Sequence, residues 1–405
     1  MPSHPVVVIL DCDFGSGDVE REELARFGIE TRFANVQNAS EAGQAVRDAD
    51  VVITQYCPVD VTLMEAAPKL RAVVRYGVGL DMIDTAAAQN RAIPVSGVTD
   101  YCTDEVADHA VALMLAATRS VVSGARATSS GEWPVPTDLP LMVSLRGRRV
   151  GLVGLGRIGR AVAERLAPFG VEIVAYDPAV SRASAEELSV RLLDLDEVFR
   201  SDVVSLHVPA TAGTIGMVDA RRLSMMRPGS ILVNVARGQL IDSTALAEGL
   251  EEYRPAVAAL DVVDPEGPGN PLASHPRVIL TPHVGGSTEE AQERIGSEVA
   301  RKFIEYSDVG TTGQRYQFPQ AQLLPREHCT RFIQVQRNLP GELRRSNEVY
   351  AKHKVNIAAQ YYQTDGEIGY VVLDCDDLLS GARDILAELR QMPGTVRARR
   401  FYRKI

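Results

Sequence analysis

The sequence predicts an α/β protein with two doubly wound parallel sheets and, toward its C-terminal end, a smaller β-α-β-β-α-β unit. Three observations carry this prediction. Short apolar runs alternate with helical patterns in two separate series, a glycine-rich turn opens the second series, and the residues after about 329 show a different order of strands and helices. The 405 residues are enough for two or three domains.

The first series covers residues 1–103. Strands are expected at its short apolar runs, which are Val6–Leu10, Val51–Thr54, Ala72–Arg75 and Ile93–Val95. Because helical patterns separate these runs, the strands should lie parallel, with helices on both faces of the sheet. Apolar residues at helical spacing then predict one long amphipathic helix over Asp104–Val122.

A second series begins at Arg149. Its apolar runs are Val150–Val153, Val171–Ala175, Val203–Leu206, Ile231–Asn234, Val257–Val262 and Val278–Leu280. Six strands complete a sheet of the dinucleotide-binding type, so residues 104–282 are predicted to form one such domain. Ser287-Thr288-Glu289-Glu290 is a capping box that opens a helix running to about Tyr306. Because the first sheet lacks a closing element, we expect residues 283–310 to return to it, which gives two Rossmann-like doubly wound parallel-sheet domains.

The C-terminal part of the chain has a different organisation. Residues 311–328 are rich in Gly, Thr, Gln and Pro and are predicted to be a linker. Within residues 329–405 we expect strands at Phe332–Val335, Asn356–Gln363, Gly369–Leu373 and Val396–Tyr402, and helices over about Gly341–His353 and Asp377–Arg390. This order predicts a ferredoxin-like (βαββαβ) unit of a size that can fold by itself.

Composition narrows the classes of function. Lysine and arginine number 43 and aspartate and glutamate 53, so the net charge is −10. An acidic chain without a long basic block is a poor binder of nucleic acid or of an anionic membrane. The five cysteines, Cys12, Cys57, Cys102, Cys329 and Cys375, include no CxxC pair, and neither a disulfide framework nor a metal site is indicated. Neither a signal peptide nor a membrane span is expected from the apolar runs, and the prediction is a cytoplasmic protein.

A dinucleotide-binding signature follows the first strand of the second series. Gly154-Leu155-Gly156-Arg157-Ile158-Gly159 has the spacing GxGxxG between a strand and a helix. Gly154 permits the tight turn, Gly156 lets backbone amides approach a pyrophosphate, and Gly159 lets helix and strand pack closely. By itself, this motif is also compatible with an ordinary glycine turn.

The cofactor type follows from Asp177, which ends the next strand 23 residues after Gly154. At this place a carboxylate accepts hydrogen bonds from the adenosine ribose hydroxyls. The same charge repels a 2′-phosphate, so NAD is expected rather than NADP.

Three polar residues follow successive predicted strands: Arg237, Glu266 and His283. The carboxyl ends of parallel strands are where such sheets bind ligands. An arginine can grip a carboxylate, a histidine can exchange a proton, and a glutamate can orient that histidine and favour its protonated form. Taken singly, each residue also fits an ordinary role in a surface ion pair, in solvent or in a loop. Together, beside a dinucleotide turn, they predict an oxidoreductase site.

At these residues the sequence resembles the NAD-dependent D-2-hydroxyacid dehydrogenases. The resemblance rests on the glycine turn, on residues 233–238, on Ala259-Leu260-Asp261-Val262 with Glu266 five residues past Asp261, and on residues 280–288, and it covers about residues 5–310. It implies that Arg237 binds the substrate carboxylate and carbonyl, that His283 is the acid/base and that Glu266 is its partner.

The same resemblance implies further contacts. Asp261 would meet the nicotinamide end of the cofactor. The other residues implied in cofactor binding are Arg157, Ile158, Val208, Pro209, Val235, Ala236, Arg237, His283, Gly285 and Gly286. Residues 75–81 match the family's substrate loop, in which the amides of Val78 and Gly79 would meet the carboxylate and Arg75 could hold an anion. Without the resemblance, this loop reads as a glycine-rich turn.

Residues 329–405 resemble an ACT domain, most closely that of the shorter bacterial D-3-phosphoglycerate dehydrogenases. The matching segments are Asn356–Tyr361, Asp365–Val372 and Pro393–Arg399. This resemblance implies an amino-acid effector, L-serine in those enzymes, held by Asn338 and Asn356. Gln336 stands where the family has a histidine, which departs from the serine-binding pattern.

The resemblance implies oxidation of 3-phospho-D-glycerate to 3-phosphohydroxypyruvate, which belongs to L-serine biosynthesis. The sequence leaves the physiological direction of this reaction open. One alternative is the same chemistry on another 2-hydroxy or 2-keto acid, such as a phosphonate or a specialised-metabolism intermediate, because Thr54-Gln55 replace an arginine common in phosphoglycerate dehydrogenases. An alternative of another class is an NAD(H)-sensing, corepressor-like binding protein. We expect a homodimer through the helix over Asp104–Val122, or a homotetramer if the C-terminal sheets also pair.

Overall fold

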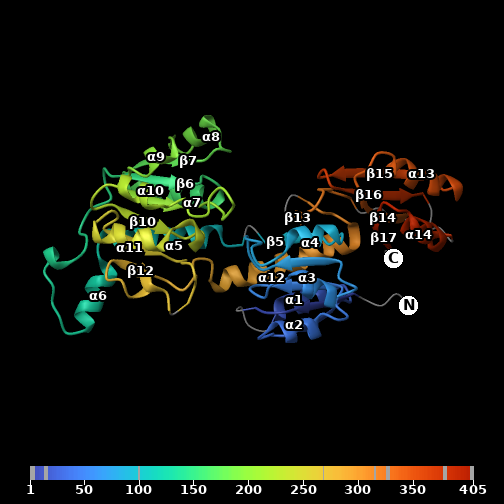
Figure 1. The fold of residues 1–405 in the computed structure, drawn as a ribbon, viewed down its shortest axis with the longest axis horizontal. Coiled ribbons are helices and arrows are strands. Elements are labelled where there is room, and N and C mark those ends of the chain that lie inside the picture. Colours follow the sequence, from blue (N-terminus) through green and yellow to red (C-terminus); the bar gives the residue numbers. More distant parts are fainter. Residues whose placement is uncertain are drawn as a thin grey trace. The chain divides into compact units, whose positions relative to one another are not determined.

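The computed structural model describes residues 5–12, 17–98, 101–267, 269–313, 316–324, 329–376 and 381–401. The chain forms two compact units. The first combines Met1–Tyr101 with Gln292–Ile405, and the second is Cys102–Ala291. Each unit contains one mainly parallel sheet, and the first unit also holds a C-terminal antiparallel sheet (Figure 1).

The parallel sheet of the first unit has the strand order β13-β5-β4-β3-β1-β2. Its strands are β1 (Val6–Ile9), β2 (Glu30–Phe33), β3 (Val51–Thr54), β4 (Ala72–Arg75), β5 (Val95–Gly97) and β13 (Tyr316–Gln317), and the helices of this part are α1 (Asp18–Ala25), α2 (Ala39–Ala45), α3 (Val61–Ala66), α4 (Thr85–Asn90) and α12 (Glu289–Ile304). The predicted parallel sheet is confirmed. The structure adds β2, an edge strand whose Glu-Thr-Arg-Phe sequence carries little apolar signal, and β13, which lies in the segment expected to be a linker and pairs antiparallel with β5.

The second unit contains a seven-stranded parallel sheet of order β12-β11-β10-β9-β6-β7-β8. The strands are β6 (Arg149–Val153), β7 (Glu172–Tyr176), β8 (Arg191–Leu192), β9 (Val203–Leu206), β10 (Ile231–Asn234), β11 (Val257–Leu260) and β12 (Val278–Leu280). The helices are α5 (Thr103–Thr118), α6 (Val121–Ser129), α7 (Arg157–Leu166), α8 (Arg182–Glu186), α9 (Leu195–Val198), α10 (Ala220–Met225) and α11 (Ser243–Glu251). The six predicted strands are present, and β8 extends the sheet beyond β7.

The single helix predicted over Asp104–Val122 is wrong. α5 and α6 are separate helices that meet at an angle of 64°. Ser120 lies between them with a left-handed φ of 48°, and its hydroxyl donates to the carbonyl of Leu141 at 2.6 Å. A local backbone conformation thus ends the helix where the apolar pattern continues. Among the described residues no single helix is long and apolar enough to cross a membrane, although α5 and α6 together satisfy length and composition.

The C-terminal sheet is antiparallel, with the order β15-β16-β14-β17. Its elements are β14 (Thr330–Arg337), α13 (Glu342–Lys352), β15 (Ile357–Thr364), β16 (Ile368–Cys375), α14 (Ala382–Gln391) and β17 (Thr395–Phe401). The predicted β-α-β-β-α-β order is therefore present. Asp377 and Tyr402, which bounded a predicted helix and strand, lie outside the described residues.

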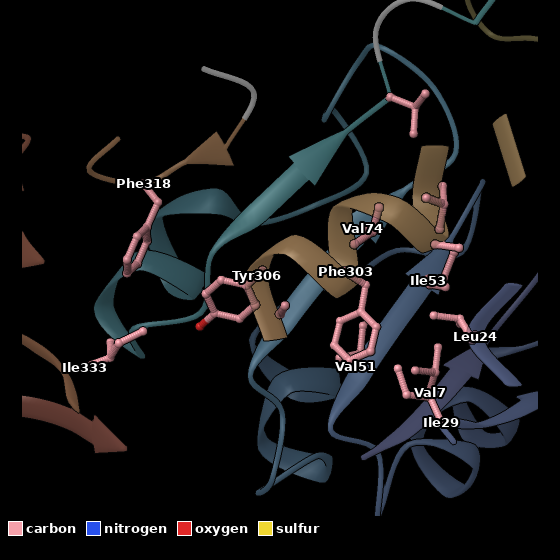
Figure 2. Packing of buried hydrophobic residues seen from close by; sticks show 14 of the residues in the cluster. Val7, Leu24, Ile29, Val51, Ile53, Val74, Phe303, Tyr306, Phe318 and Ile333 are labelled. Atoms are coloured by element: carbon pink, nitrogen blue, oxygen red, sulfur yellow. The ribbon is translucent and has the colours of Figure 1, made fainter. Parts of the chain in front are cut away.

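Both faces of this sheet are buried along β14 and β16, whereas the edge strand β15 is largely exposed. On one face, Phe332 and Leu373 pack in a cluster with α13 and α14. The other face shares the core of the parallel sheet, where Ile333, Tyr370 and Val372 lie in one cluster with residues of β1, β3, β4 and α12. Figure 2 shows Ile333 near Tyr306 and Phe318, with Phe303 between them and the strands. The alternation of side chains along each strand explains how one strand serves two cores.

Polar contacts also hold this sheet in place. Arg331 forms a buried ion pair with Asp374 at 2.6 Å and donates to the carbonyls of Val309 and Leu324. The hydroxyl of Tyr370 donates to the carbonyl of Gly310 at 2.6 Å. The segment after α12 is therefore held by the C-terminal sheet, and its described residues, 311–313 and 316–324, are not a simple spacer.

Candidate active site

The carboxyl ends of the parallel strands in the second unit form one edge of its sheet. The predicted site residues follow these strands in turn: Gly154 to Gly159 after β6, Asp177 after β7, Val208 and Pro209 after β9, Val235 to Arg237 after β10, Asp261 and Glu266 after β11, and His283 to Gly286 after β12. The parallel topology therefore places the predicted cofactor and catalytic residues of this unit at a single edge.

The glycine turn has the geometry that a dinucleotide site needs. Gly154 has a φ of 96°, and a Cβ on it would lie 2.6 Å from the carbonyl oxygen of His207. A Cβ on Gly159 would collide with the carbonyl of Gly154, so helix and turn can pack only with glycine there. A Cβ on Gly156 would meet nothing within 4 Å. The turn therefore leaves room beside the N-terminus of α7 for a diphosphate, with Arg157 exposed and Ile158 half-buried next to it.

Asp177 lies directly beside this turn. One oxygen of its carboxylate accepts from the amide of Leu155 at 2.8 Å, and the other accepts from the amide of Ala179 at 2.9 Å. The side chain is half-buried. These contacts hold a negative charge at the end of β7, next to the position that a diphosphate would take. The residues present therefore fit a dinucleotide with an unmodified ribose.

The turn after β10 orients Arg237. The side chain of Asn234 accepts from the amide of Ala236 at 3.0 Å and donates to the carbonyl of Arg237 at 2.8 Å. A Cβ on Gly238 would collide with the backbone of Val263, so this turn packs closely on the segment after β11. Arg237 is half-buried, and its Nη1 donates to the carbonyl of Ala236 at 2.6 Å. The guanidinium is thus held beside the strand end.

Glu266 and His283 are brought together although they follow different strands. The Oε1 atom of Glu266 lies 2.9 Å from Nδ1 of His283. Nδ1 of His283 makes no hydrogen bond among the described residues, and the contact becomes an ion pair when the ring is protonated. His283 also has a left-handed φ of 54°, a costly conformation for a residue with a side chain. Both side chains remain partly exposed, at 37% for His283 and 50% for Glu266.

Asp261 is buried below the His283 loop, with only 2% of its side chain exposed. Its carboxylate accepts from the hydroxyl of Thr281 at 2.6 Å and from the amides of Val284 and Gly285 at 3.0 and 2.8 Å. Burial raises the pKa of the Asp261 carboxyl, but hydrogen bonds from His109, Thr281 and the two amides outweigh it, and the pKa is lowered. Asp261 thus anchors the loop, and its expected contact with the nicotinamide end of the cofactor stays a prediction.

Sequence reasoning missed two members of this network, His109 and Thr281. Nε2 of His109, on α5, lies 3.0 Å from Oγ1 of Thr281 and 3.3 Å from Oδ1 of Asp261. His109 and Asp261 are 152 residues apart in the chain. No spacing rule connects these two residues. The helical periodicity of apolar residues on α5 does not predict a polar contact for His109.

The predicted substrate loop lies in the first unit, after β4. Nε of Arg75 donates to the carbonyl of Gln55 at 3.2 Å, and its Nη1 donates to that of Gly79 at 2.9 Å. Gly77 has a φ of 123°, and a Cβ on it would lie 2.7 Å from Nη1 of Arg75. Val78 is exposed and Gly79 half-buried. Arg75 therefore braces the loop that was predicted to present amides to a carboxylate.

The end of the neighbouring strand β3 is occupied by an acidic side chain. The carboxylate of Asp11 accepts from the hydroxyl of Thr54 at 2.9 Å and from the amides of Gln55, Tyr56 and Cys57 at 2.9, 2.6 and 2.9 Å. A cluster of backbone amides of this kind is well suited to an anion. Here the anion is part of the protein.

The two predicted effector residues flank strands of the C-terminal sheet: Asn338 follows β14, and Asn356 precedes β15. Asn338 accepts from the hydroxyl of Tyr362 at 2.8 Å and donates to the carbonyl of Gly366 at 3.2 Å. The exposed side chain of Asn356 donates to the carboxylate of Asp376. Gln336 is buried and accepts from the hydroxyl of Ser346 at 3.2 Å.

With this geometry established, known proteins provide the comparison. Residues 111–285 match the family described as D-isomer specific 2-hydroxyacid dehydrogenase, NAD binding domain. A D-3-phosphoglycerate dehydrogenase of Haemophilus influenzae is 36% identical over 373 residues, which are 90% of this chain and 90% of that protein. The chain belongs to the D-isomer specific 2-hydroxyacid dehydrogenase family.

Further relatives agree with this assignment. The D-3-phosphoglycerate dehydrogenase of Escherichia coli K12 is 36% identical over 366 residues, 89% of this chain and 88% of that protein. Among solved structures, an NAD-dependent formate dehydrogenase of Staphylococcus aureus in complex with NAD is 31% identical, with a TM-score of 0.67 over 75% of this chain and 95% of that one. As a member of this family the protein is an NAD-dependent dehydrogenase, and the expected cofactor is confirmed.

Proposed function

We propose that this dehydrogenase interconverts 3-phospho-D-glycerate and 3-phosphohydroxypyruvate, the first step of L-serine biosynthesis, with His283 as its acid/base. The observation that carries the catalytic part is the contact of His283 with Glu266 at the strand ends that also hold the glycine turn. The substrate is supported by the names of relatives that match 90% of the chain.

The roles of the residues follow from their chemistry. Arg237 has a forked guanidinium that binds a carboxylate and polarises the adjacent carbonyl. His283 removes the hydroxyl proton in oxidation and returns it in reduction. Glu266 stabilises the imidazolium that forms when His283 holds the proton. When bound, NAD would supply the redox chemistry as the acceptor of a hydride from the hydroxy acid.

For the cofactor site, we propose that Gly154, Gly156, Arg157, Ile158 and Gly159 bind the diphosphate and that Asp177 binds the ribose. The open space at Gly156 and the position of Asp177 beside Leu155 support this proposal. The other proposed contacts are those of Val208, Pro209, Val235, Ala236, Gly285 and Gly286, which follow strand ends at the same edge. Asp261 is proposed to meet the nicotinamide end of the cofactor, and it also anchors the loop that carries His283.

A second substrate class is favoured by one observation. The donors at the end of β3 are taken up by Asp11, so they do not serve a phosphate there. In the first unit, Arg75 is then the candidate for binding a second anionic group of the substrate. The alternative substrate to 3-phospho-D-glycerate is a 2-hydroxy acid without phosphate, or a phosphonate. An NAD(H)-sensing protein without turnover is the third possibility, which the paired Glu266 and His283 disfavour.

The experiment is a panel of 2-keto acids assayed by loss of NADH absorbance. The panel contains 3-phosphohydroxypyruvate, a phosphonate keto acid and keto acids without phosphate. The highest kcat/KM should belong to 3-phosphohydroxypyruvate. A preference for another keto acid would replace the substrate, and a lack of turnover with every acid would favour a sensing protein.

We further propose the domain division expected from the sequence. Residues 1–103 and 283–310 bind the substrate, residues 104–282 bind NAD, residues 311–328 connect, and residues 329–405 form an ACT domain with Asn338 and Asn356 at an amino-acid effector site. The β-α-β-β-α-β order supports the ACT assignment. We also propose a cytoplasmic location, which the absence of a disulfide among Cys12, Cys57, Cys102, Cys329 and Cys375 supports.

The assembly we propose is a homodimer, or a homotetramer if the C-terminal sheets pair. Large apolar side chains on and after α6 support the dimer: Trp133 is 89% exposed, and Val121 and Val135 are more than half exposed. Light scattering of the purified protein tests this, and an active monomer would contradict it.

A further inference from the structure

The loop that carries His283 rests on a pair of side chains that come from elsewhere in the second unit. Asp261, at the end of β11, binds the amides of Val284 and Gly285. His109, on α5, contacts Asp261 and Thr281 through one ring nitrogen. The residues on both sides of His283 are therefore connected to the same two side chains.

The direction of the hydrogen bonds follows from counting protons. An ionised carboxylate can only accept, so the hydroxyl of Thr281 donates its single proton to Asp261, at 2.6 Å. The oxygen of Thr281 is then an acceptor toward Nε2 of His109, at 3.0 Å. Nε2 of His109 must therefore carry a proton. His109 is the donor that completes the network.

The loop has little freedom to move against this pair. A Cβ on Gly285 would lie 2.9 Å from Oδ2 of Asp261 and 3.5 Å from Cδ2 of His109. His283 has a φ of 54°, a conformation that persists only where surrounding contacts impose it. Its amide donates to the carbonyls of Asp261 and Thr281 at 2.9 and 3.0 Å. The direction of the imidazole thus depends on how firmly Asp261 and Thr281 are held.

We propose that His109 is a positioning residue for the reaction: its Nε2–H fixes Thr281 and Asp261, and through them the backbone that aims His283. This inference rests on the proposed role of His283 as the acid/base. His109 touches the loop's anchors and not the reacting atoms. A displacement of about 1 Å in a reacting group can cost about a hundredfold in rate. A residue that does not touch the reacting atoms can therefore still affect kcat strongly.

The test compares His109→Leu with His109→Gln. Leucine removes the donor, whereas the amide nitrogen of glutamine can replace Nε2–H. We expect kcat to fall about ten- to a hundredfold in His109→Leu and to return to within about threefold of the unmodified enzyme in His109→Gln. The Kd for NADH should be unchanged in both, because the glycine turn is not touched. Asp108→Asn is the matched control on the same helix, since the exposed side chain of Asp108 pairs with Arg165.

A double-variant measurement separates positioning from a loss of folding. Thr281→Val removes the hydroxyl through which His109 holds Asp261 and leaves the direct contact of the two side chains at 3.3 Å. The losses in kcat should therefore be shared in large part, and the variant carrying both His109→Leu and Thr281→Val should lose less than the product of the two single losses. A wild-type kcat in His109→Leu, equal damage by leucine and glutamine, or fully additive losses would overturn the inference. His283→Asn is run in parallel: if it keeps full activity, the proposed function fails, whereas an inactive His283→Asn beside an active His109→Leu removes only the role of His109.

Discussion

The carboxylate of Asp11 accepts a hydrogen bond from the hydroxyl of Thr54 at 2.9 Å, at the end of the strand where phosphoglycerate dehydrogenases commonly carry an arginine. The amides of the next three residues turn toward the same carboxylate. The backbone amides at this strand end are therefore hydrogen-bonded within the protein, to a carboxylate that brings negative charge. Any phosphate bound by the first unit must find its positive partner elsewhere.

The first prediction concerns Arg75, which braces Gln55 and Gly79 beside this strand end. Arg75→Ala should lower kcat/KM for 3-phosphohydroxypyruvate about ten- to a hundredfold, because one charged hydrogen bond is worth roughly 1.5–3 kcal/mol. Arg71→Ala is the control, since Arg71 pairs with Asp50 at the other end of β4. Efficient use of 3-phosphohydroxypyruvate that is indifferent to Arg75→Ala would show that the phosphate is bound by other residues.

The second prediction concerns the choice between NAD and NADP. Asp177→Asn should reduce kcat/KM for NAD by about tenfold or more and erode the preference over NADP, because the ribose loses a charged acceptor and the 2′-phosphate loses a repelling neighbour. The asparagine retains an oxygen that can accept from Leu155, so the glycine turn should keep its shape. Steady-state kinetics with both cofactors measure this. Equal efficiency with the two cofactors in the unmodified protein would contradict the role of Asp177.

The third prediction concerns proton transfer. His283→Asn should lower kcat about a hundredfold or more, the usual worth of a positioned acid/base, while NADH still binds. Glu266→Gln should narrow the pH range of reduction on its alkaline side, because the protonated ring loses the negative neighbour at 2.9 Å. The pH dependence of kcat/KM in both directions tests this. An unchanged profile in Glu266→Gln would leave Glu266 without an electrostatic role.

The fourth prediction concerns the shared core. From the sequence, deletion of residues 330–405 should leave activity and remove only an amino-acid response. Because Ile333, Tyr370 and Val372 belong to the core of the first unit, we now expect the deletion to lower the thermal stability of that unit as well.

A single substitution tests the same interface without removing the sheet. Ile333→Ala should reduce the free energy of unfolding by about 2–5 kcal/mol, as buried large-to-small changes do. Leu339→Ala, at a side chain that is mostly exposed, is the control and should change it little. Denaturant unfolding measures both. If the two variants were equally stable, the C-terminal sheet would not depend on this core in solution.

The fifth prediction concerns pH and stability. Lys302 on α12 is buried and donates to Oγ of Ser96 at 3.0 Å. Burial lowers the pKa of Lys302 from 10.5 to about 8. The folded chain thus binds this proton less tightly than the unfolded chain. The free-energy cost of burying the charged ammonium is therefore present in full below pH 8. Between about pH 8 and pH 10.5 the folded chain loses the proton first, so the free energy of unfolding rises with pH.

Lys302→Met removes that penalty together with the hydrogen bond to Ser96. The Tm of the variant relative to the unmodified protein should therefore be higher at pH 7 than at pH 10. Lys352→Met, at an exposed lysine, should show no such trend. Calorimetry across this pH range decides the matter, and a difference in Tm that stays constant would mean that Lys302 is not titrating as its burial requires.

The sequence by itself determined the parallel sheets, the glycine turn and the candidate triad. The six apolar runs of the second unit coincide with strands β6, β7 and β9 to β12, because a strand buried on both faces needs a continuous run of apolar residues. Gly154 and Gly159 were found for a similar reason: no other residue fits where backbone atoms approach so closely. Such requirements act within a few residues and leave a mark in the local pattern.

Only the tertiary structure decided which distant groups meet. His109 contacts Thr281 and Asp261. Asp11 accepts hydrogen bonds from the amides after Thr54. Ile333 packs in the same core as Val7. The local pattern also continues through Ser120, where a left-handed φ divides α5 from α6. The contacts of His109, Asp11 and Ile333 join segments far apart in the chain, and hydrogen bonding and packing at such contacts set no fixed spacing in the sequence. The break at Ser120 is a single backbone conformation that the apolar pattern does not record.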